Sequence, residues 1–99
     1  MILDKKEKQP VEIKDYPIDY TEWLSPISDT IADAVAQIEC LTDAANTALS
    51  LHSLGVSTTG VAVWLSGGTD GERYKVTVTV TTLGGRVDQS EFIIKVKEH

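Results

Sequence analysis

Three glycines in a polar loop make SGGTDGE, residues 66–72, the best candidate for a ligand site in this chain. A phosphate-binding loop needs a terminal Gly-Lys-Ser or Gly-Lys-Thr sequence and a helix that starts directly behind it. Here the loop runs instead into Arg73 and the alternating sequence YKVTVTVTT, which is typical of a strand. A calcium loop needs several oxygen ligands at alternating positions, and Asp70 and Glu72 supply only two. We therefore expect neither phosphate nor metal in this loop.

The other reactive side chains stand alone in the sequence. Cys40 is the only cysteine and cannot form an internal disulfide, so we interpret it as a small buried residue. His52 has no second ligand or catalytic partner at a useful spacing. The motifs G-x-S-x-G and H-E-x-x-H are absent. We predict that the protein has no catalytic residues, no cofactor and no metal, and that it acts through its surface rather than as an enzyme.

The length and the charge of the chain narrow the classes of partner. Ninety-nine residues suffice for one domain with one hydrophobic core. The net charge of −6 argues against nucleic acid, and no apolar run approaches the roughly 18 residues of a membrane span or the core of a secretion signal. Residues 16–50 contain six Asp and Glu and no Lys or Arg. This segment indicates a solvated acidic face or a docking surface for a basic partner.

The C-terminal third carries the clearest strand pattern. VAVWL at 61–65 is a short apolar run, and RYKVTVTVTT at 73–82 alternates almost perfectly. The turn LGGR at 83–86 offers two glycines for a tight hairpin, and EFIIKVKE resumes the alternation. We therefore predict a β-hairpin at the C-terminus. The side chains expected to face the core are Tyr74, Val76, Val78, Val80, Phe92, Ile94 and Val96.

Residues 29–45 support two readings. Their apolar residues are spaced as on one face of a helix, at Ile31, Ala34, Val35, Ile38 and Leu41, behind the capping residues Ser28 and Asp29. The same segment also alternates as in a strand, with apolar residues at every second position from Ala32 to Cys40. The pattern alone favours the helix. The following run ALSLHSLGVSTTG, residues 48–60, indicates a strand and then a glycine-containing loop.

The N-terminal segment looks different from the rest of the chain. Residues 1–14 mix charged residues with a proline and show little apolar periodicity, which is typical of an extended arm that orders against a neighbour. Residues 16–24 suit an edge strand, because Pro17 lacks a backbone donor and aromatic and β-branched residues follow it. Ser25-Pro26 then predicts a turn. We therefore divide the chain into an arm at 1–14 and a single domain at 15–99.

The glycine loop fits one structural role. In an immunoglobulin-like sandwich a D-x-G-x-Y sequence precedes a strand, and the tyrosine hydroxyl bonds back to nearby backbone. Asp70, Gly71 and Tyr74 match this pattern with one extra residue before the tyrosine. Val76 stands where an antibody domain carries its second disulfide cysteine, so no such bridge is expected. We assign this corner to Trp64, Gly67, Gly68, Gly71 and Tyr74.

The run VWLSGGTDGERYKVTVTVTTLGGRVDQSEFIIKV, residues 63–96, resembles the C-terminal half of the small phage fiber-tail adaptor family. The family pattern is roughly V-W-L-S-G-G-x-x-G-x-x-Y-x-V, then T-x-x-G-R-x-D, then S-x-x-I-x-V. Upstream, Asp29-Thr30-Ile31-Ala32 resembles its D-T-I-A element, although the tryptophan that usually follows is missing here. Further upstream, six residues resemble the family's aspartate and aromatic strand: Asp15, Tyr16, Asp19, Tyr20, Trp23 and Leu24.

The resemblance implies a fold that differs from the helical reading. It implies an all-β protein, an immunoglobulin/fibronectin-III-like antiparallel β-sandwich in which D-T-I-A begins a strand. We therefore expect a strand at 30–38, with a short helical turn after it in the middle segment, because tertiary context can override local propensity.

The resemblance also implies a structural role in a bacteriophage. The protein would be a virion component, made in the host cytoplasm, that is present in several copies of a symmetric assembly and joins tail or neck proteins to fibres. Neither nucleic acid nor membrane is expected as a partner. We expect Tyr16, Tyr20 and Trp23 to contact the partners together with the arm. Two alternatives stay open, a capsid or tail decoration domain and a carbohydrate-binding immunoglobulin-like module.

Overall fold

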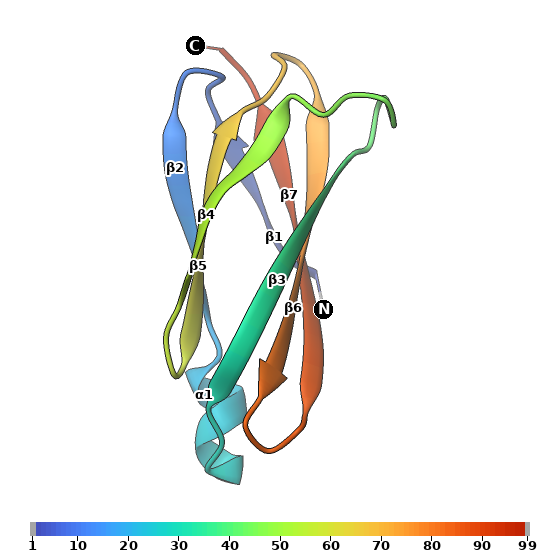
Figure 1. The fold of residues 1–99 in the computed structure, drawn as a ribbon. Coiled ribbons are helices and arrows are strands. Elements are labelled where there is room, and N and C mark those ends of the chain that lie inside the picture. Colours follow the sequence, from blue (N-terminus) through green and yellow to red (C-terminus); the bar gives the residue numbers. More distant parts are fainter. Residues whose placement is uncertain (1, 99) are drawn as a thin grey trace.

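The computed structural model describes residues 2–98 of the chain, with side chains described for residues 5–98. The described residues form two sheets that pack face to face (Figure 1). The first sheet contains, in order, β1 (Ile2–Lys8), β7 (Val87–Val96), β6 (Arg73–Thr82) and β3 (Ile31–Cys40). The second contains β2 (Ile13–Asp19), β5 (Gly60–Gly67) and β4 (Leu49–Val56). Between β2 and β3 lie the helix α1 (Thr21–Leu24) and the 3-10 turn η1 (Ser25–Ile27).

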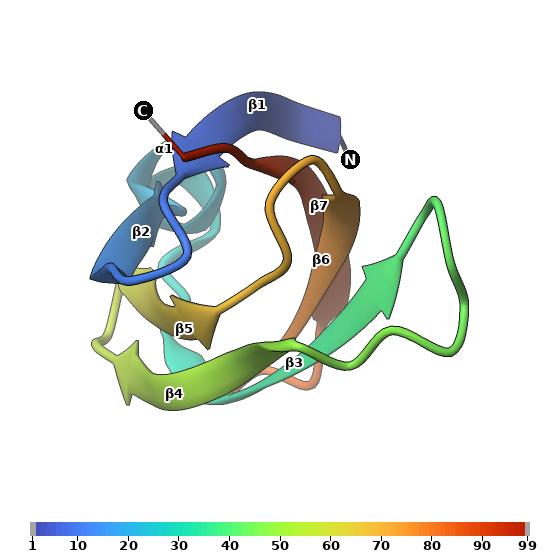
Figure 2. The same cartoon turned by 90° about the horizontal axis from the view of Figure 1, so that it is seen from above.

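The strand order is that of an immunoglobulin-like sandwich. Within the described chain, neighbouring strands run antiparallel except that β1 lies parallel to β7. The second sheet has the order of three of the four strands in one immunoglobulin sheet, and β3, β6 and β7 have the order of the other sheet. Seen from above, the two sheets enclose the core between them (Figure 2). The predicted fold class is therefore confirmed.

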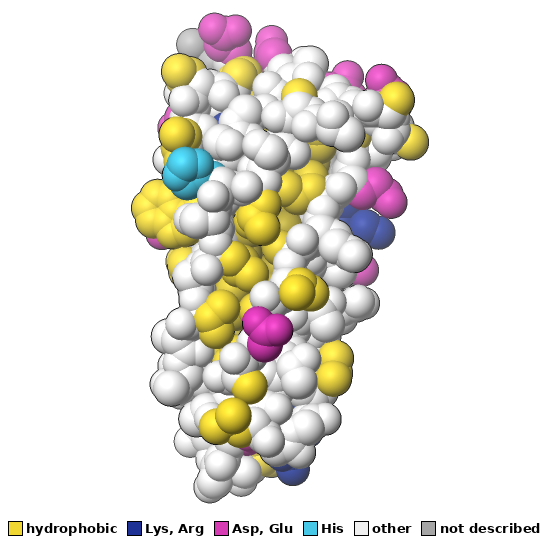
Figure 3. Space-filling model, viewed as in Figure 1, with side chains coloured by type: hydrophobic (Ala, Val, Ile, Leu, Met, Phe, Trp, Pro, Cys, Tyr) yellow, Lys and Arg dark blue, Asp and Glu magenta, His cyan; other side chains and the backbone are white. Residues whose placement is uncertain are grey.

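The core is built by the alternation that marks β6 and β7. All seven side chains predicted to face inward on these two strands are at most 3% exposed, so the predicted C-terminal hairpin is confirmed. The second sheet contributes the buried side chains of Val61, Val63 and Leu65 from β5. Along one side the core is less completely covered, and apolar side chains show at the surface between β4 and β3 (Figure 3).

The ambiguous middle segment is a strand. Residues Ile31–Cys40 form β3 and pair with β6, with Ala34 opposite Val80 and Ile38 opposite Val76. The helix favoured by local spacing is therefore wrong, because pairing with the long β6 strand outweighs the propensity of an alanine-rich segment. The expected helical turn after this strand is also wrong. The connection at 41–48 is irregular and contains a turn closed by the Asn46 N–H, which donates to the Asp43 carbonyl oxygen at 2.9 Å.

The helical residues lie earlier than predicted. β2 is an edge strand as expected, but it ends at Asp19, and α1 and η1 occupy part of the predicted strand and the predicted Ser25-Pro26 turn. The Asp19 carboxylate accepts a hydrogen bond from the Thr21 N–H at 2.9 Å, which satisfies an amide that a short helix leaves free. The helix also places Leu24 in the core, where it is 1% exposed.

The N-terminal residues belong to the sandwich. β1 is extended as predicted for residues 1–14, and it pairs with β7 as the outer strand of the first sheet. Lys8 ties this strand to the second sheet, because its Nζ donates to the carbonyl oxygens of Gly67 at 2.6 Å and Gln9 at 2.9 Å. The Lys8 side chain is 1% exposed, and this burial lowers its pKa, although the charge of Glu12 acts in the opposite direction.

Candidate functional site

The glycine loop between β5 and β6 is held by Tyr74. The Tyr74 ring is fully buried, and its hydroxyl accepts the Thr69 N–H at 3.0 Å and donates to Asn46 Oδ1 at 3.0 Å. This return of the hydroxyl to backbone a few residues upstream is the geometry of a tyrosine corner. Gly68 has a φ of 104°, and a Cβ at this position would lie 2.7 Å from Val96 Cγ2. The loop is therefore packed closely against Val96 of β7 at Gly68.

A second joint connects the start of β3 to the β6–β7 turn. The Asp29 side chain is 6% exposed, and its Oδ2 lies 2.9 Å from Arg86 Nη1. Its Oδ1 accepts the backbone N–H groups of Thr30 at 2.9 Å and Gly84 at 3.1 Å. A hydrogen bond from the Thr82 side chain, followed by these donors, lowers the pKa of Asp29 to about 2. The ionised carboxylate of Asp29 therefore links the β6–β7 turn to the segment that leads into β3.

We expect the Asp29 joint to stabilise the fold at neutral pH and to fail in acid. The pKa of Asp29 is lowered from 3.8 to about 2 in the folded state. Its contribution to the free energy of unfolding is therefore present above pH 3.8 and is lost as the pH falls toward 2. Asp29→Asn should lower the free energy of unfolding at about pH 6, and the difference from the wild type should shrink toward about pH 2. Denaturant unfolding at several pH values measures this difference. A difference that stays constant with pH would contradict the ionic role of Asp29.

Two of the three aromatic residues predicted to bind partners lie in the core. Tyr16 is 6% exposed and Tyr20 is 3% exposed. The Tyr16 hydroxyl donates to the Glu7 carbonyl oxygen at 3.1 Å, and the Tyr20 hydroxyl donates to Ser90 Oγ at 3.0 Å. Burial raises the pKa of Tyr16 to about 12. These two rings are therefore buried in this fold and hydrogen-bonded within it, and their predicted contact with a partner stays a prediction.

Trp23 is the third predicted contact residue and is only partly covered. It packs on the rim of the core in an edge-to-face arrangement with Tyr20, at a centroid distance of 6.1 Å. It borders a hollow of about 260 Å³ together with the carboxylates of Asp19, Glu22 and Asp88. The burial of Tyr20 removes the pair of exposed rings on which a sugar could stack, which counts against the carbohydrate-binding alternative.

A more exposed aromatic surface lies on the outer side of the three-stranded sheet. Val61, Val63 and Leu65 face the core, so Ala62 and Trp64 point outward from β5. Trp64 is 37% exposed, and it was assigned from the sequence to the corner. Three rows of paired residues form this surface, which we call the Trp64 face: Ile13, Ser66 and Ser50; Asp15, Trp64 and Ser53; Pro17, Ala62 and Gly55.

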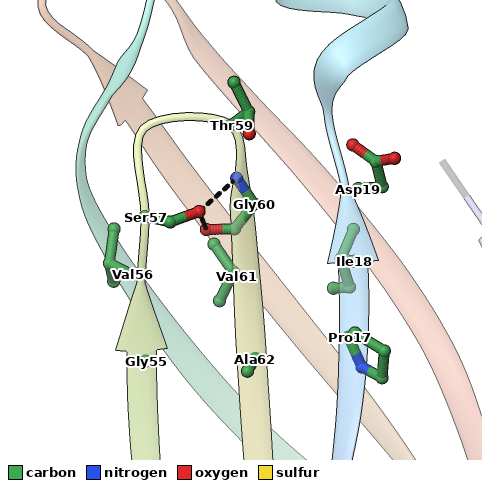
Figure 4. A pocket seen from close by; sticks show the side chains of 10 residues that line it. All are labelled: Pro17, Ile18, Asp19, Gly55, Val56, Ser57, Thr59, Gly60, Val61 and Ala62. Atoms are coloured by element: carbon green, nitrogen blue, oxygen red, sulfur yellow. Dashed lines mark hydrogen bonds between the residues drawn. The ribbon is translucent and has the colours of Figure 1, made fainter.

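Pro17, Ala62 and Gly55 have small side chains or none, so the Trp64 face is hollowed next to the row that contains Trp64. A cavity of about 480 Å³ lies over Pro17, Ala62 and Gly55 and over the end of the β4–β5 hairpin (Figure 4). The Ser57 side chain holds this hairpin, accepting the Gly60 N–H at 3.0 Å and donating to the Gly60 carbonyl oxygen at 3.2 Å. The hollow therefore lies beside a hairpin turn that the Ser57 side chain holds.

The sequence contained a signal for this face that the motif reading missed. The alternation of VAVWL, with Val61, Val63 and Leu65 as the buried set, requires that Trp64 lies on the opposite side of the strand. Because WLSGG was read as one corner motif, Trp64 was grouped with the glycines. Among the described residues, no helix is long and apolar enough to cross a membrane, and no group of three or more His, Cys, Asp or Glu side chains could hold a metal ion.

Comparison with known proteins identifies the family. A family model described as podophage GP4 fiber-tail adaptor protein gp77 matches residues 8–95, and no curated protein matches the chain. The matched range begins at the buried Lys8 and includes the Asp29 joint, the Tyr74 corner and Trp64. It also includes all but the last residue of the runs on which the resemblance was based, so the resemblance is confirmed. The chain therefore belongs to the podophage fiber-tail adaptor family, and it is a non-enzymatic structural adaptor of the phage virion.

Proposed function

We propose that the adaptor binds a tail or fibre protein through the Trp64 face. Membership of the family implies that the partners are tail and fibre proteins, and the exposed tryptophan supports this particular surface. Tryptophan is enriched among the residues that dominate binding energy, above all where it sits among small neighbours that exclude water. On this face Trp64 stands between Asp15 and Ser53, beside the hollow over Ala62 and Gly55.

The low charge of the Trp64 face supports the same proposal. Among its nine residues Asp15 carries the only charge, and depletion of charge marks the cores of protein interfaces. Ile13 adds an apolar side chain that is 55% exposed at one corner. A partner would lay an apolar patch against Trp64 and insert a side chain into the hollow, burying Trp64 completely.

We further propose that the adaptor acts in several copies. A chain of 99 residues offers one three-stranded face of modest area, so a single attachment is expected to be weak. In a symmetric assembly each added attachment acts at a high effective concentration, and modest contacts sum to a stable junction. The number of adaptor copies in a purified tail measures this directly, and a single copy would contradict it.

Trp64→Ala and Ala62→Leu should both impair tail assembly. The first substitution removes the predicted anchor, and the second fills the hollow that would receive the partner. In a phage lacking this gene and supplied with each variant, we expect the amount of adaptor in purified tails to fall at least about tenfold. Quantitative mass spectrometry of the tails measures the effect.

The matched control for these variants is Val35→Ala. Val35 is 54% exposed on the outer side of the other sheet, and its loss should leave assembly unchanged. Both test residues point away from the core, so all three variants should unfold within about 1 kcal/mol of the wild type. Normal incorporation of both Trp64→Ala and Ala62→Leu would contradict binding through the Trp64 face.

A further inference from the structure

We infer that the α1 end of one adaptor copy docks into a basic hollow on the first sheet of a second copy. This inference rests on the proposal that the adaptor acts in several copies, and it does not involve the Trp64 face. The basic hollow has a volume of about 640 Å³ and is lined mainly by residues of β1, β6 and β7. The α1 end is the surface around α1 that contains Asp19, Glu22, Trp23 and Asp88.

The basic hollow gathers the cations of an otherwise acidic chain. Four of the nine Lys and Arg residues line it, with one carboxylate among them: Lys5, Lys6, Arg73, Lys95 and Glu7. Arg73 lies directly opposite Lys95 in the β6–β7 pairing, and like charges in such a pair destabilise a sheet. Among residues 5–98, neither Arg73 nor Lys95 forms an ion pair. The basic hollow therefore carries positive charge that an acidic partner would neutralise.

Two apolar side chains lie among these cations. Leu41 is 47% exposed, and its N–H donates to the Arg73 carbonyl oxygen at 2.8 Å, which places it beside Arg73. Ile93 lies on the outer side of β7, because its neighbours Phe92 and Ile94 are buried in the core. An apolar centre with a polar rim is typical of protein interfaces. The basic hollow therefore suits a partner surface that combines an apolar side chain with carboxylates.

The α1 end of the adaptor itself has this composition. Trp23 is partly exposed and borders a hollow at the surface. Three carboxylates line the same hollow: Asp19, Glu22 and Asp88. Residues 15–72, which include α1, contain no Lys or Arg, and Arg86 in the β6–β7 turn is paired with Asp29. In the inferred contact Trp23 packs on the apolar centre of the basic hollow, and the carboxylates face its cations.

The two surfaces are too far apart to meet within one copy. β7 runs from Asp88 at the α1 end to Lys95 at the basic hollow, and seven residues of strand span about 23 Å. Figure 1 shows α1 at one end of the sandwich and the start of β6 at the other. The contact therefore joins two copies. A contact between two unlike surfaces of identical copies can repeat around a ring, as an adaptor present in several copies requires.

Charge reversal at each surface tests this inference with the purified protein. Lys95→Glu changes the basic hollow and Glu22→Lys changes the α1 end, and both residues are exposed. In analytical ultracentrifugation at low salt we expect the wild type to self-associate with a Kd below about 1 mM, and each variant to bind at least about tenfold more weakly. An equimolar mixture of the two variants should regain association, because Lys95→Glu keeps the native α1 end and Glu22→Lys keeps the native hollow.

Matched controls make the same changes in net charge outside the two surfaces. Lys14→Glu alters an exposed residue of β2, and Glu98→Lys alters an exposed residue beyond β7. Both should self-associate like the wild type, and circular dichroism with thermal unfolding establishes that all four variants fold. A monomeric wild type at low salt, or equal effects of test and control variants, would overturn the inference. If the mixture stays monomeric while Lys95→Glu lowers the amount of adaptor in tails, the hollow binds a different acidic protein and the inference is also overturned.

Carbodiimide cross-linking locates the contact, since it joins a carboxylate to an amine only where the two groups touch. In a mixture of unlabelled and isotope-labelled protein, mass spectrometry should detect peptides of mixed label that join Glu22 or Asp88 to Lys95. Mixed-label cross-links confined to other residues would overturn the inference. If purified tails contain several copies but lack these cross-links, this inference fails and the proposal of several copies stands. A single copy in the tail would contradict the proposal of several copies itself.

Discussion

Deletion of residues 1–8 should strongly destabilise the fold. The deletion removes the β1–β7 pairing and the two hydrogen bonds of the buried Lys8, and it leaves the Tyr16 hydroxyl without the Glu7 carbonyl oxygen. Hydrogen bonds from a charged group contribute about 1.5–3 kcal/mol, so we expect a loss of about 3 kcal/mol or more. For a domain of this size the melting temperature would fall by at least about 12 °C. Thermal unfolding followed by circular dichroism measures the change.

A shorter deletion serves as the control. Without residues 1–4 the continuous pairing of Lys5–Lys8 with β7 remains, as do the contacts of Lys8. This variant should melt within a few degrees of the wild type, whereas Lys8→Met in the full chain should reproduce much of the loss seen on deleting residues 1–8. If deletion of residues 1–8 leaves the melting temperature unchanged, the segment is an independent arm and β1 does not stabilise the sandwich.

Tyr74→Phe should cost about 1–3 kcal/mol of stability without changing the fold. The phenylalanine ring fills the same space in the core, so the effect isolates the hydroxyl. Its removal leaves the Thr69 N–H without an acceptor and takes away one of the two donors to Asn46 Oδ1, which keeps the Ala48 N–H at 2.9 Å. Both groups lie in the loops that join the two sheets. The free energy of unfolding in urea, compared with the wild type, measures the cost.

Tyr16→Phe is the matched control for Tyr74→Phe. The Tyr16 hydroxyl makes one described hydrogen bond, to the Glu7 carbonyl oxygen at 3.1 Å, whereas the Tyr74 hydroxyl makes two at 3.0 Å. The loss of stability should therefore be smaller for Tyr16→Phe. Equal losses, or a wild-type stability for Tyr74→Phe, would show that the corner does not depend on the hydroxyl.

The parts of the fold that the sequence predicted are those that local pattern determines. The alternation of β6 and β7 has a period of two, and a four-residue connection with two glycines, residues 83–86, joins them. The hairpin and its inward residues therefore followed directly from the sequence. The strand at 30–38 followed from the family resemblance and not from the pattern. Its alanines favour a helix locally, and only pairing with the long strand β6 makes the extended conformation more stable than the helix.

The parts that the sequence did not predict depend on distant pairing. β1 is rich in lysine and looks like a solvated arm, yet it pairs with a strand more than eighty residues away, and Lys8 donates to the Gly67 carbonyl oxygen in the other sheet. Tyr16 and Tyr20 looked like binding residues because aromatic residues are common at interfaces, but their hydroxyl groups have partners inside the fold. The exposure of Trp64 was not predicted, because Trp64 lies in the WLSGG run, which was interpreted as a structural corner.

The motif residues of the family hold the sandwich together. Asp29 and Arg86 join the hairpin to β3, and Tyr74 and Gly68 join the loop to the core. None of these residues is exposed as a binding side chain would be, apart from the partly exposed Arg86 that pairs with Asp29. We therefore interpret the motif as the framework of the adaptor, with binding assigned to the Trp64 face.

Electron cryomicroscopy of the assembled tail tests this account most directly. It shows in one map how many adaptor copies are present and which of their surfaces are covered. We predict several copies in which a tail or fibre protein covers Trp64 and fills the hollow over Ala62 and Gly55. A map in which Trp64 faces solvent in every copy, while the partners contact other surfaces, would contradict it.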